Sequence, residues 1–233
     1  MKRFALFAFF VAVALCVLVG LGTWQLERKA WKDALIAELQ AKLAAPPTDL
    51  PARERWQRLT AATDEFRRVA FPAEFLSGEE ALVYSSGSSL RPDVSGPGYF
   101  VFAPARLPGG QTVVINRGYS AQPDAKPVRG NVDVVGYLRF PESGSLFVAD
   151  HDANTWFVRD QRAMAKELGW GDVAPFYVDQ EGPQPAGGLP KAGPLKAGLP
   201  NNHLQYAVTW YGLALVILIA AMVFWRARRR GVS

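Results

Sequence analysis

The sequence predicts an α+β membrane protein, in which two transmembrane helices flank a mainly antiparallel β-sheet or partial-barrel domain with one or two helices. Two observations lead to this prediction: a long uncharged run lies near each end, and short runs of alternating apolar residues lie between them. At about 1.5 Å per residue, each uncharged run is long enough as a helix to cross a hydrocarbon core of roughly 30 Å.

The first run predicts a transmembrane helix over residues 4–26, which continues to about residue 45, where Pro46-Pro47 ends it. The run is longer than a secretory signal requires, and no Ala-x-Ala cleavage site follows it, so we expect an uncleaved anchor. Small side chains allow close packing against a second span. The faces expected to pack in this way are those of Ala8 and Ala12, or of Gly20 and Trp24.

The second transmembrane helix is predicted over residues 204–225, because Pro200 and a capping asparagine, Asn201 or Asn202, precede it. His203 therefore lies in the first turn, at the boundary between membrane and water. The partial positive charge of a helix N-terminus disfavours imidazolium, and neutral imidazole is the form that binds metal or haem iron.

Tyr206 and Trp210 share a helical face with His203. Two interpretations of this face remain open. It is a cofactor or partner site, or it belongs to the belt of aromatic residues that lies at membrane interfaces because one end of each side chain is apolar and the other polar.

The charge distribution predicts the topology. Six of the 26 basic residues lie at the two ends, Lys2 and Arg3 before the first span and four arginines in the tail 226–233, which leaves 20 basic against 21 acidic residues between them. Basic flanks favour the cytoplasmic side, so we expect both termini in the cytoplasm and residues 27–202 outside. The high pI thus reflects topology, and we expect no nucleic-acid partner.

Residues 46–181 are predicted to form the β-rich extracytoplasmic domain, with a central hairpin of Tyr99–Leu107 and Thr112–Ser120. Asp160 is expected to cap a short helix over Gln161–Leu168. Ten of the nineteen residues in 182–200 are Gly or Pro, so we interpret 182–203 as a linker that cannot pack, together with the cap of the second helix.

Three further candidate sites were weighed. Arg117 ends an apolar strand and would either clamp a carboxylate ligand or pair with an acidic neighbour. Asp150-His151-Asp152 has metal-ligand residue types, but adjacent positions rarely point together, so we expect an exposed turn. Cys16 is the only cysteine and lies mid-membrane. With no nucleophile elbow, phosphate loop or dinucleotide fingerprint, the sequence gives no indication of an enzyme.

Several motifs resemble those of the SURF1 family of cytochrome c oxidase assembly proteins. The stretch from Pro200 to Ala214 (PNNHLQYAVTWYGLA) resembles the C-terminal signature of that family, and the stretch from Gly22 to Lys32 (GTWQLERKAWK) its N-terminal signature. GYFVFAP from Gly98 and NRGY from Asn116 resemble central motifs, although the family usually has Trp where Tyr119 stands.

The resemblance implies an assembly factor for haem–copper cytochrome c oxidase that binds haem a at the outer membrane interface and assists its insertion into the catalytic subunit. It assigns His203 the role of haem-iron ligand. Because haem a is largely apolar with two propionates at one edge, we expect aromatic side chains to pack on it and basic ones to neutralise the propionates. The further members of this predicted site are Tyr206, Trp210, Trp24, Arg28 and Lys32.

The expected partners are the oxidase catalytic subunit, membrane lipid and the haem a synthesis machinery. No mitochondrial transit segment is recognised before the first span, so we expect a bacterial member in the inner membrane with its domain in the periplasm. The alternative function is a cofactor-free membrane scaffold that stabilises an oxidase subunit. A periplasmic sensor or envelope enzyme would need an output domain or a catalytic cluster, and neither is recognisable.

Overall fold

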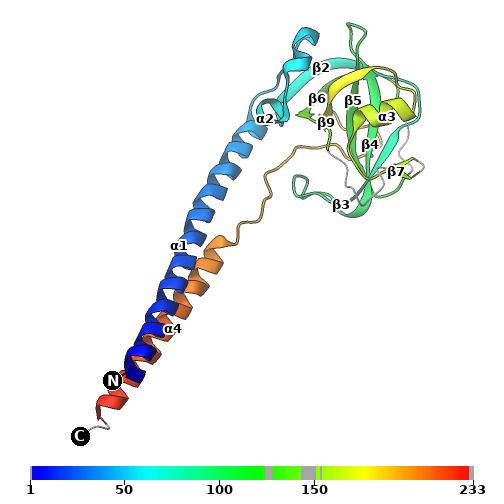
Figure 1. Cartoon of the computed structure of the whole chain (residues 1–233). Coiled ribbons are helices and arrows are strands. Elements are labelled where there is room, and N and C mark those ends of the chain that lie inside the picture. Colours follow the sequence, from blue (N-terminus) through cyan, green and yellow to red (C-terminus); the bar gives the residue numbers. More distant parts are fainter. Residues whose placement is uncertain (1, 124–127, 143–150, 153, 231–233) are drawn as a thin grey trace. The chain divides into compact units, whose positions relative to one another are not determined.

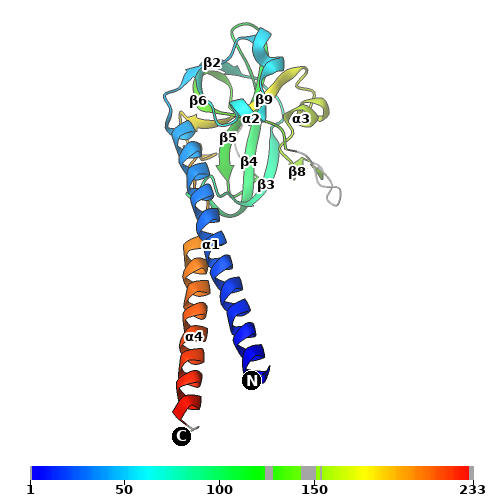
Figure 2. The ribbon, with the colours of Figure 1, turned by 60° about the vertical axis from the view of Figure 1, so that its left-hand side comes forward.

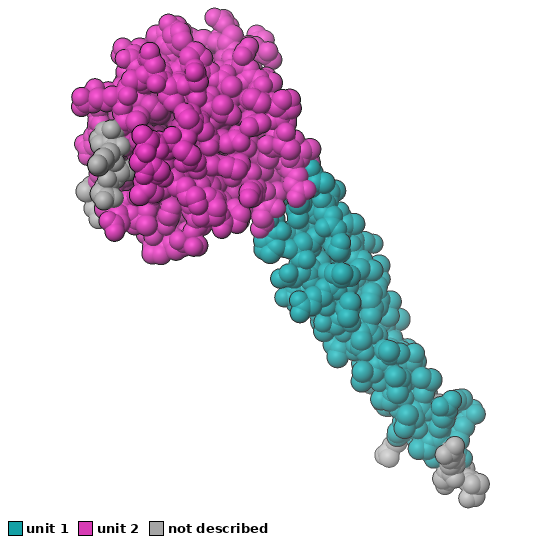
Figure 3. Space-filling view, turned by 180° about the vertical axis from the view of Figure 1, so that it is seen from behind, with its two compact units in different colours: residues 1–37, 199–233 teal, residues 38–198 magenta. Residues whose placement is uncertain are grey.

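The computed structural model describes residues 2–123, 128–142, 151–152 and 154–230 (Figure 1). The chain divides into two units, which Figure 3 shows in different colours. The first, the helix-pair unit, contains residues 1–37 and 199–233. The second, the globular unit, contains residues 38–198.

Two helices at the ends of the chain are long and apolar enough to cross a membrane, as predicted: α1 (Lys2–Ala44) and α4 (His203–Arg230). The first helix continues past its apolar part and ends directly before Pro46-Pro47, because a proline disfavours helical backbone in the residue before it. Most of the apolar side chains on both helices are exposed within the chain, as expected of surfaces that lie in lipid.

The helices of the helix-pair unit lie side by side and antiparallel (Figures 1 and 2). Phe7 contacts Phe224 at one end, with 4.9 Å between ring centroids, and Gln25 contacts His203 at the other. The covered positions of α4 recur at alternating intervals of three and four residues, the spacing of helices packed at a small crossing angle. These positions are His203, Ala207, Trp210, Ala214, Ile217 and Ala221, and Tyr211 beside Trp210 is covered as well.

The globular unit is a mixed sheet with short helices. Its elements are β1 (Thr48–Asp49), η1 (Arg53–Arg58), α2 (Ala61–Asp64), β2 (Arg68–Phe75), β3 (Ala81–Gly87), β4 (Ser95–Arg106), β5 (Thr112–Ser120), β6 (Gly130–Arg139), β7 (His151–Asp152), β8 (Thr155–Trp156), α3 (Gln161–Glu167) and β9 (Val173–Gly182). The strand order is β1-β2-β6-β9-β5-β4-β3-β8-β7, and most neighbours are antiparallel, while β1–β2, β3–β8 and β5–β9 are parallel.

A short second pairing, of β2 with β4 at Glu74 and Phe75, curls the sheet into a partial barrel. One core fills its concave side and includes Ile115, Leu138 and Phe176, with Trp56 of η1 packed against Phe176. A second core lies on the opposite face, where α3 covers β4, β5 and β9 (Figure 1). Because both faces are covered, the central strands are apolar on both sides.

Local signals predicted most of these elements. The hairpin of β4 and β5 turns at Gly110, whose φ of +84° favours glycine. Asp160 caps α3 by accepting hydrogen bonds from the amides of Arg162 and Ala163. Pro72 lies in the part of β2 that pairs only with β6, so its missing N–H costs no bond. The strand β8 contains only Thr155 and Trp156.

The expectation that the Gly/Pro-rich segment cannot pack is wrong. Residues 183–198, here called the strap, cross the globular unit and form backbone hydrogen bonds with it. Lys191 and Tyr119 bond in both directions, at 2.7 and 3.1 Å, and the Lys196 amide donates to Leu90. Leu195 is buried against Leu43 and Tyr137. Backbone hydrogen bonds at close approach hold the strap against the sheet, and such packing requires few large side chains.

Gly118 makes this crossing possible. Its φ is +127°, and a Cβ there would overlap the backbone of Lys191. Gly87 has nearly the same φ, +128°, but open space around it. The two positions therefore separate the cost of an unusual backbone conformation from the cost of displacing the strap.

We expect Val114→Asp to destabilise the globular unit by several kcal/mol in order of magnitude, because Val114 is fully buried and the carboxylate would have no partner. Thermal melting of the full chain in detergent measures this. Leu189→Asp, at an exposed position, is the control and should melt like the parent. Equal melting temperatures for both variants would contradict the burial of β5.

We expect Gly118→Ala to lower the free energy of unfolding by about 1–3 kcal/mol more than Gly87→Ala does. Both substitutions strain a backbone with positive φ, but only the Cβ at residue 118 would collide with the strap. Chemical denaturation of the two variants beside the parent gives the difference. If the two substitutions cost the same, the strap does not pack against β5.

Candidate functional site

His203 begins α4 and contacts the neighbouring helix. Its Nδ1 lies 2.7 Å from Oε1 of Gln25, one residue after Trp24 on α1. Both side chains are partly covered. The backbone carbonyl of Asn202 accepts a hydrogen bond from the Tyr206 amide, so Asn202 occupies the capping position. Sequence reasoning placed His203 correctly in the first turn but did not identify Gln25 as its partner.

Polar contacts hold the start of α4 beside α1. The Asn201 amide donates to Asp33 at 2.7 Å, and Asp33 also pairs with Lys29. Lys32 donates to the backbone carbonyl of Pro200. These contacts lie on the side of the His203–Gln25 pair that is farther from the apolar runs. On α1 their residues follow Gln25, and at the start of α4 they precede His203. Asn201 therefore serves the helix contact and not the capping role that the sequence suggested as one alternative.

On the apolar side of the pair, Tyr211 packs against Gly22. A Cβ at Gly22 would lie 2.8–3.0 Å from the Tyr211 ring, and the Tyr211 hydroxyl is 3.1 Å from Oγ1 of Thr23. The expected close-packing face is therefore wrong. The side chains of Ala8, Ala12 and Trp24 are exposed, and Gly20 has no neighbour within 4 Å.

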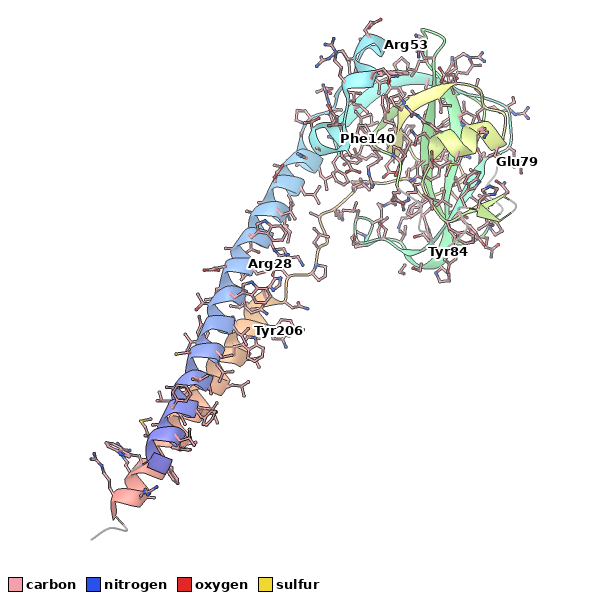
Figure 4. All side chains as sticks on the ribbon, in the orientation of Figure 1. Arg28, Arg53, Glu79, Tyr84, Phe140 and Tyr206 are labelled. Atoms are coloured by element: carbon pink, nitrogen blue, oxygen red, sulfur yellow. The ribbon has the colours of Figure 1, made fainter. Side chains whose placement is uncertain are left out.

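The aromatic members of the predicted site are arranged unequally. Tyr206 and Trp24 are more than half exposed, whereas Trp210 is partly covered in the helix pair. Figure 4 shows Tyr206 on α4 and Arg28 on α1, both in the part of the helix pair where α4 begins. Tyr206, one turn after His203, and Trp24, next to Gln25, are therefore the exposed rings in this part of the helix pair.

The basic members differ in availability. The Arg28 guanidinium lies over the Trp31 ring, 4.1 Å from its centroid, and remains exposed. The Lys32 ammonium is instead engaged by the Pro200 carbonyl. Arg28 is thus the better placed of the two to meet an anionic group, while Lys32 fixes the chain entering α4.

The motif Asn116-Arg117-Gly118-Tyr119 has a structural role. The Asn116 amide donates to Asp179 at 2.6 Å, and the Tyr119 hydroxyl donates to the carbonyls of Gly96 and Pro97. Arg117 donates two hydrogen bonds to the Glu80 carboxylate, in a pair that is nearly fully buried. Burial raises the pKa of Glu80, and the Arg117 charge opposes this shift. Of the two roles weighed for Arg117, the structure supports pairing with an acidic neighbour.

His151 is not in an exposed turn. It lies in β7, partly covered, with its ring 4.4 Å from that of Trp156. Asp150 and the side chain of Asp152 lie outside the described residues. Among the residues that the structure describes, no group of three or more His, Cys, Asp or Glu side chains is placed to hold a metal ion.

The globular unit also has an open groove of about 860 Å³ between η1 and α3. Its charged lining is mixed: Arg53, Arg162 and Lys166 are basic and Glu54 and Asp172 are acidic, and Arg53 lies 3.9 Å from Asp172. Arg53 and Tyr84 lie at opposite ends of the globular unit (Figure 4). Near Tyr84, the rings of Tyr99 and Phe157 form an aromatic cluster with it.

Two apolar helices at the ends of the chain, with a mixed β-domain between them, fit a membrane protein with two spans. Comparison with known proteins gives the family. The SURF1 family model matches residues 12–215. A SURF1-like protein of Monosiga brevicollis is 35% identical over 92% of this chain and 85% of its own length. Surfeit locus protein 1 of Mus musculus is 32% identical over 83% of this chain and 67% of its own length. The human protein of that name is 31% identical over 84% of this chain and 69% of its own length. The chain belongs to the SURF1 family, as its motifs predicted.

We expect Gly22→Leu to separate the helices, because the new side chain would occupy the space of the Tyr211 ring. Cross-linking of Phe7→Cys to Phe224→Cys with a short bismaleimide, in a Cys16→Ser background, reports the pairing. Gly20→Leu, two residues away on the exposed face, is the control. Cross-linking should fall several-fold only with Gly22→Leu, and equal yields would contradict the assigned interface.

Proposed function

We propose that this chain is an assembly factor for haem–copper cytochrome c oxidase that binds haem a at the outer membrane interface and assists its insertion into the catalytic subunit. The observation that carries the proposal is His203, whose Nδ1 is engaged by Gln25 in a chain of the SURF1 family. In the neutral ring, that contact leaves Nε2 as the coordinating atom.

The donor set fits haem iron better than a structural metal. A single imidazole at the membrane interface is a sufficient axial ligand for haem, whereas a structural zinc site needs about four protein ligands. Bound haem a would supply an iron centre that takes the imidazole. Weak, single-ligand attachment is suited to a cargo that must leave again.

The surroundings of His203 suit an apolar ring with an anionic edge. Tyr206 and Trp24 offer exposed aromatic surface for a porphyrin, and Trp210 supports the helix pair behind it. Arg28 lies on the aqueous side and offers a guanidinium to a propionate. Lys32 contributes less directly, because its ammonium already binds the Pro200 carbonyl.

We place the globular unit outside the cytoplasm. Arg226, Arg228 and Arg229 follow the apolar part of α4, and Lys2 and Arg3 precede that of α1. Basic residues are retained on the cytoplasmic side. The start of α4, with His203, then faces the outer leaflet. A bacterial inner membrane with the globular unit in the periplasm agrees with this arrangement, and the partners would be the oxidase catalytic subunit, surrounding lipid and haem a synthesis.

The second candidate function is a cofactor-free scaffold that stabilises an oxidase subunit. The groove between η1 and α3 favours it, since basic residues such as Arg162 and Lys166 and the acidic residues Glu54 and Asp172 line an open surface on which a protein segment has room to dock. An absorption spectrum of the protein purified after co-expression with haem a synthesis distinguishes the two functions.

We expect His203→Ala to abolish the haem absorption band or shift it to shorter wavelength, with protein level unchanged. His151→Ala, at the only other histidine, is the control and should keep the parent spectrum. Arg28→Ala should only weaken retention, and more so at high salt, because its pair with a propionate would be partly exposed and screened. Unchanged haem content and spectrum in His203→Ala would refute the ligand assignment and leave the scaffold function.

We expect protease added from the periplasmic side to digest the globular unit and spare both basic termini. Epitope tags at the two ends and antibodies to the globular unit follow the fragments. A globular unit that stays intact while a periplasmic control protein is digested would overturn the topology.

A further inference from the structure

We propose that Gln25 is a positioning residue for His203: it holds the imidazole in the tautomer with hydrogen on Nδ1 and so directs the Nε2 lone pair to the ligand. This inference rests on the proposed function, because it assigns a role toward the same cofactor. Among the described residues, the one side-chain hydrogen bond of Gln25 is with His203, so Gln25 would act on the cofactor only through the histidine.

The chemistry of the contact decides the tautomer. A side-chain amide oxygen has lone pairs and no hydrogen, so Oε1 of Gln25 only accepts. With Oε1 facing the ring at 2.7 Å, Nδ1 of His203 is the donor in the proposed arrangement. In a neutral ring the hydrogen on Nδ1 leaves Nε2 unprotonated. Among the described residues, the His203 ring forms no other hydrogen bond, so nothing competes for Nε2.

The position of the contact makes it selective. Gln25 is a lone amide at the aqueous end of an apolar run, where an unsatisfied polar group is costly and a satisfied one is strongly directional. Its partner is 178 residues away in the sequence. The hydrogen bond therefore exists only when the two helices are paired, which couples the state of the histidine to the helix contact.

Neighbouring contacts restrict the pair from both sides. Tyr211 packed on Gly22 sets the separation of the helices one turn into the apolar region. Asn201 bonded to Asp33 fixes the chain just before His203 on the aqueous side. Between these two contacts the imidazole has little freedom to turn away. A hydrogen-bond acceptor behind a ligating imidazole orients the ring and raises its basicity, and losing such a partner typically weakens metal binding about 10–100-fold.

The first test needs no haem. The chain has two histidines, so a ¹⁵N spectrum of histidine-labelled protein in detergent resolves His203 once His151→Ala has assigned the other ring. We expect the parent and Gln25→Glu, which keeps an acceptor at the same reach, to show hydrogen on Nδ1. Gln25→Leu should shift His203 toward hydrogen on Nε2. Gln205→Leu, which removes an exposed amide near His203 without removing its partner, should leave the spectrum unchanged. Hydrogen on Nε2 in the parent, or no change in Gln25→Leu, would overturn the proposal.

The second test titrates the same variants with hemin and measures affinity from the absorption band. Gln25→Leu should bind about 10–100-fold more weakly, with Gln25→Glu and Gln205→Leu close to the parent. Cross-linking of the helices, as described for Gly22, shows whether Gln25→Leu still pairs. Loss of binding in His203→Ala with full binding in a paired Gln25→Leu would refute the positioning role alone. Full binding in His203→Ala would instead refute the proposed ligand and reduce Gln25 to a helix contact.

Discussion

At Gly118 and at Gly22, a second segment of the chain packs directly against the backbone, in space that any side chain would fill. In the globular unit, the strap crosses β5 at Gly118 and exchanges two hydrogen bonds with Tyr119. In the helix-pair unit, the ring of Tyr211 lies on Gly22 and brings Gln25 to His203. Both contacts join segments far apart in the sequence, and each fixes the position of a segment that local propensity leaves free.

The same close packing explains the structural role of Asn116-Arg117-Gly118-Tyr119 in this chain. Asn116, Arg117, Gly118 and Tyr119 lie in a strand with neighbours on both sides and cover on both faces. Polar side chains in such a strand must be satisfied internally, and here Asp179, Glu80 and two backbone carbonyls satisfy them. At the end of the motif, the Tyr119 hydroxyl is the donor that reaches the carbonyls of Gly96 and Pro97.

In the helix-pair unit, polar groups gather where α4 begins. Lys29, Lys32, Asp33 and Asn201 fix the approach of the chain, and Gln25 meets His203 one turn farther into the apolar region. This concentration of paired polar groups distinguishes the start of α4 from the apolar remainder of the helix pair. The Gln25 contact holds the His203 ring at Nδ1, so the helix pairing sets the orientation of the imidazole.

The sequence by itself determined the elements and the identity of the histidine. Uncharged runs defined both long helices, the turn at Gly110 defined the central hairpin, and Asp160 defined the start of α3, because each signal acts over a few residues. Only the tertiary structure decided that a Gly/Pro-rich segment packs as a strap, that Gly22 rather than Gly20 faces α4, and that Gln25 is the partner of His203. These outcomes depend on which faces meet after the chain has turned back on itself. Composition does not specify which faces meet. The contacts are made by small residues and a single amide, and these give only weak local signals in the sequence.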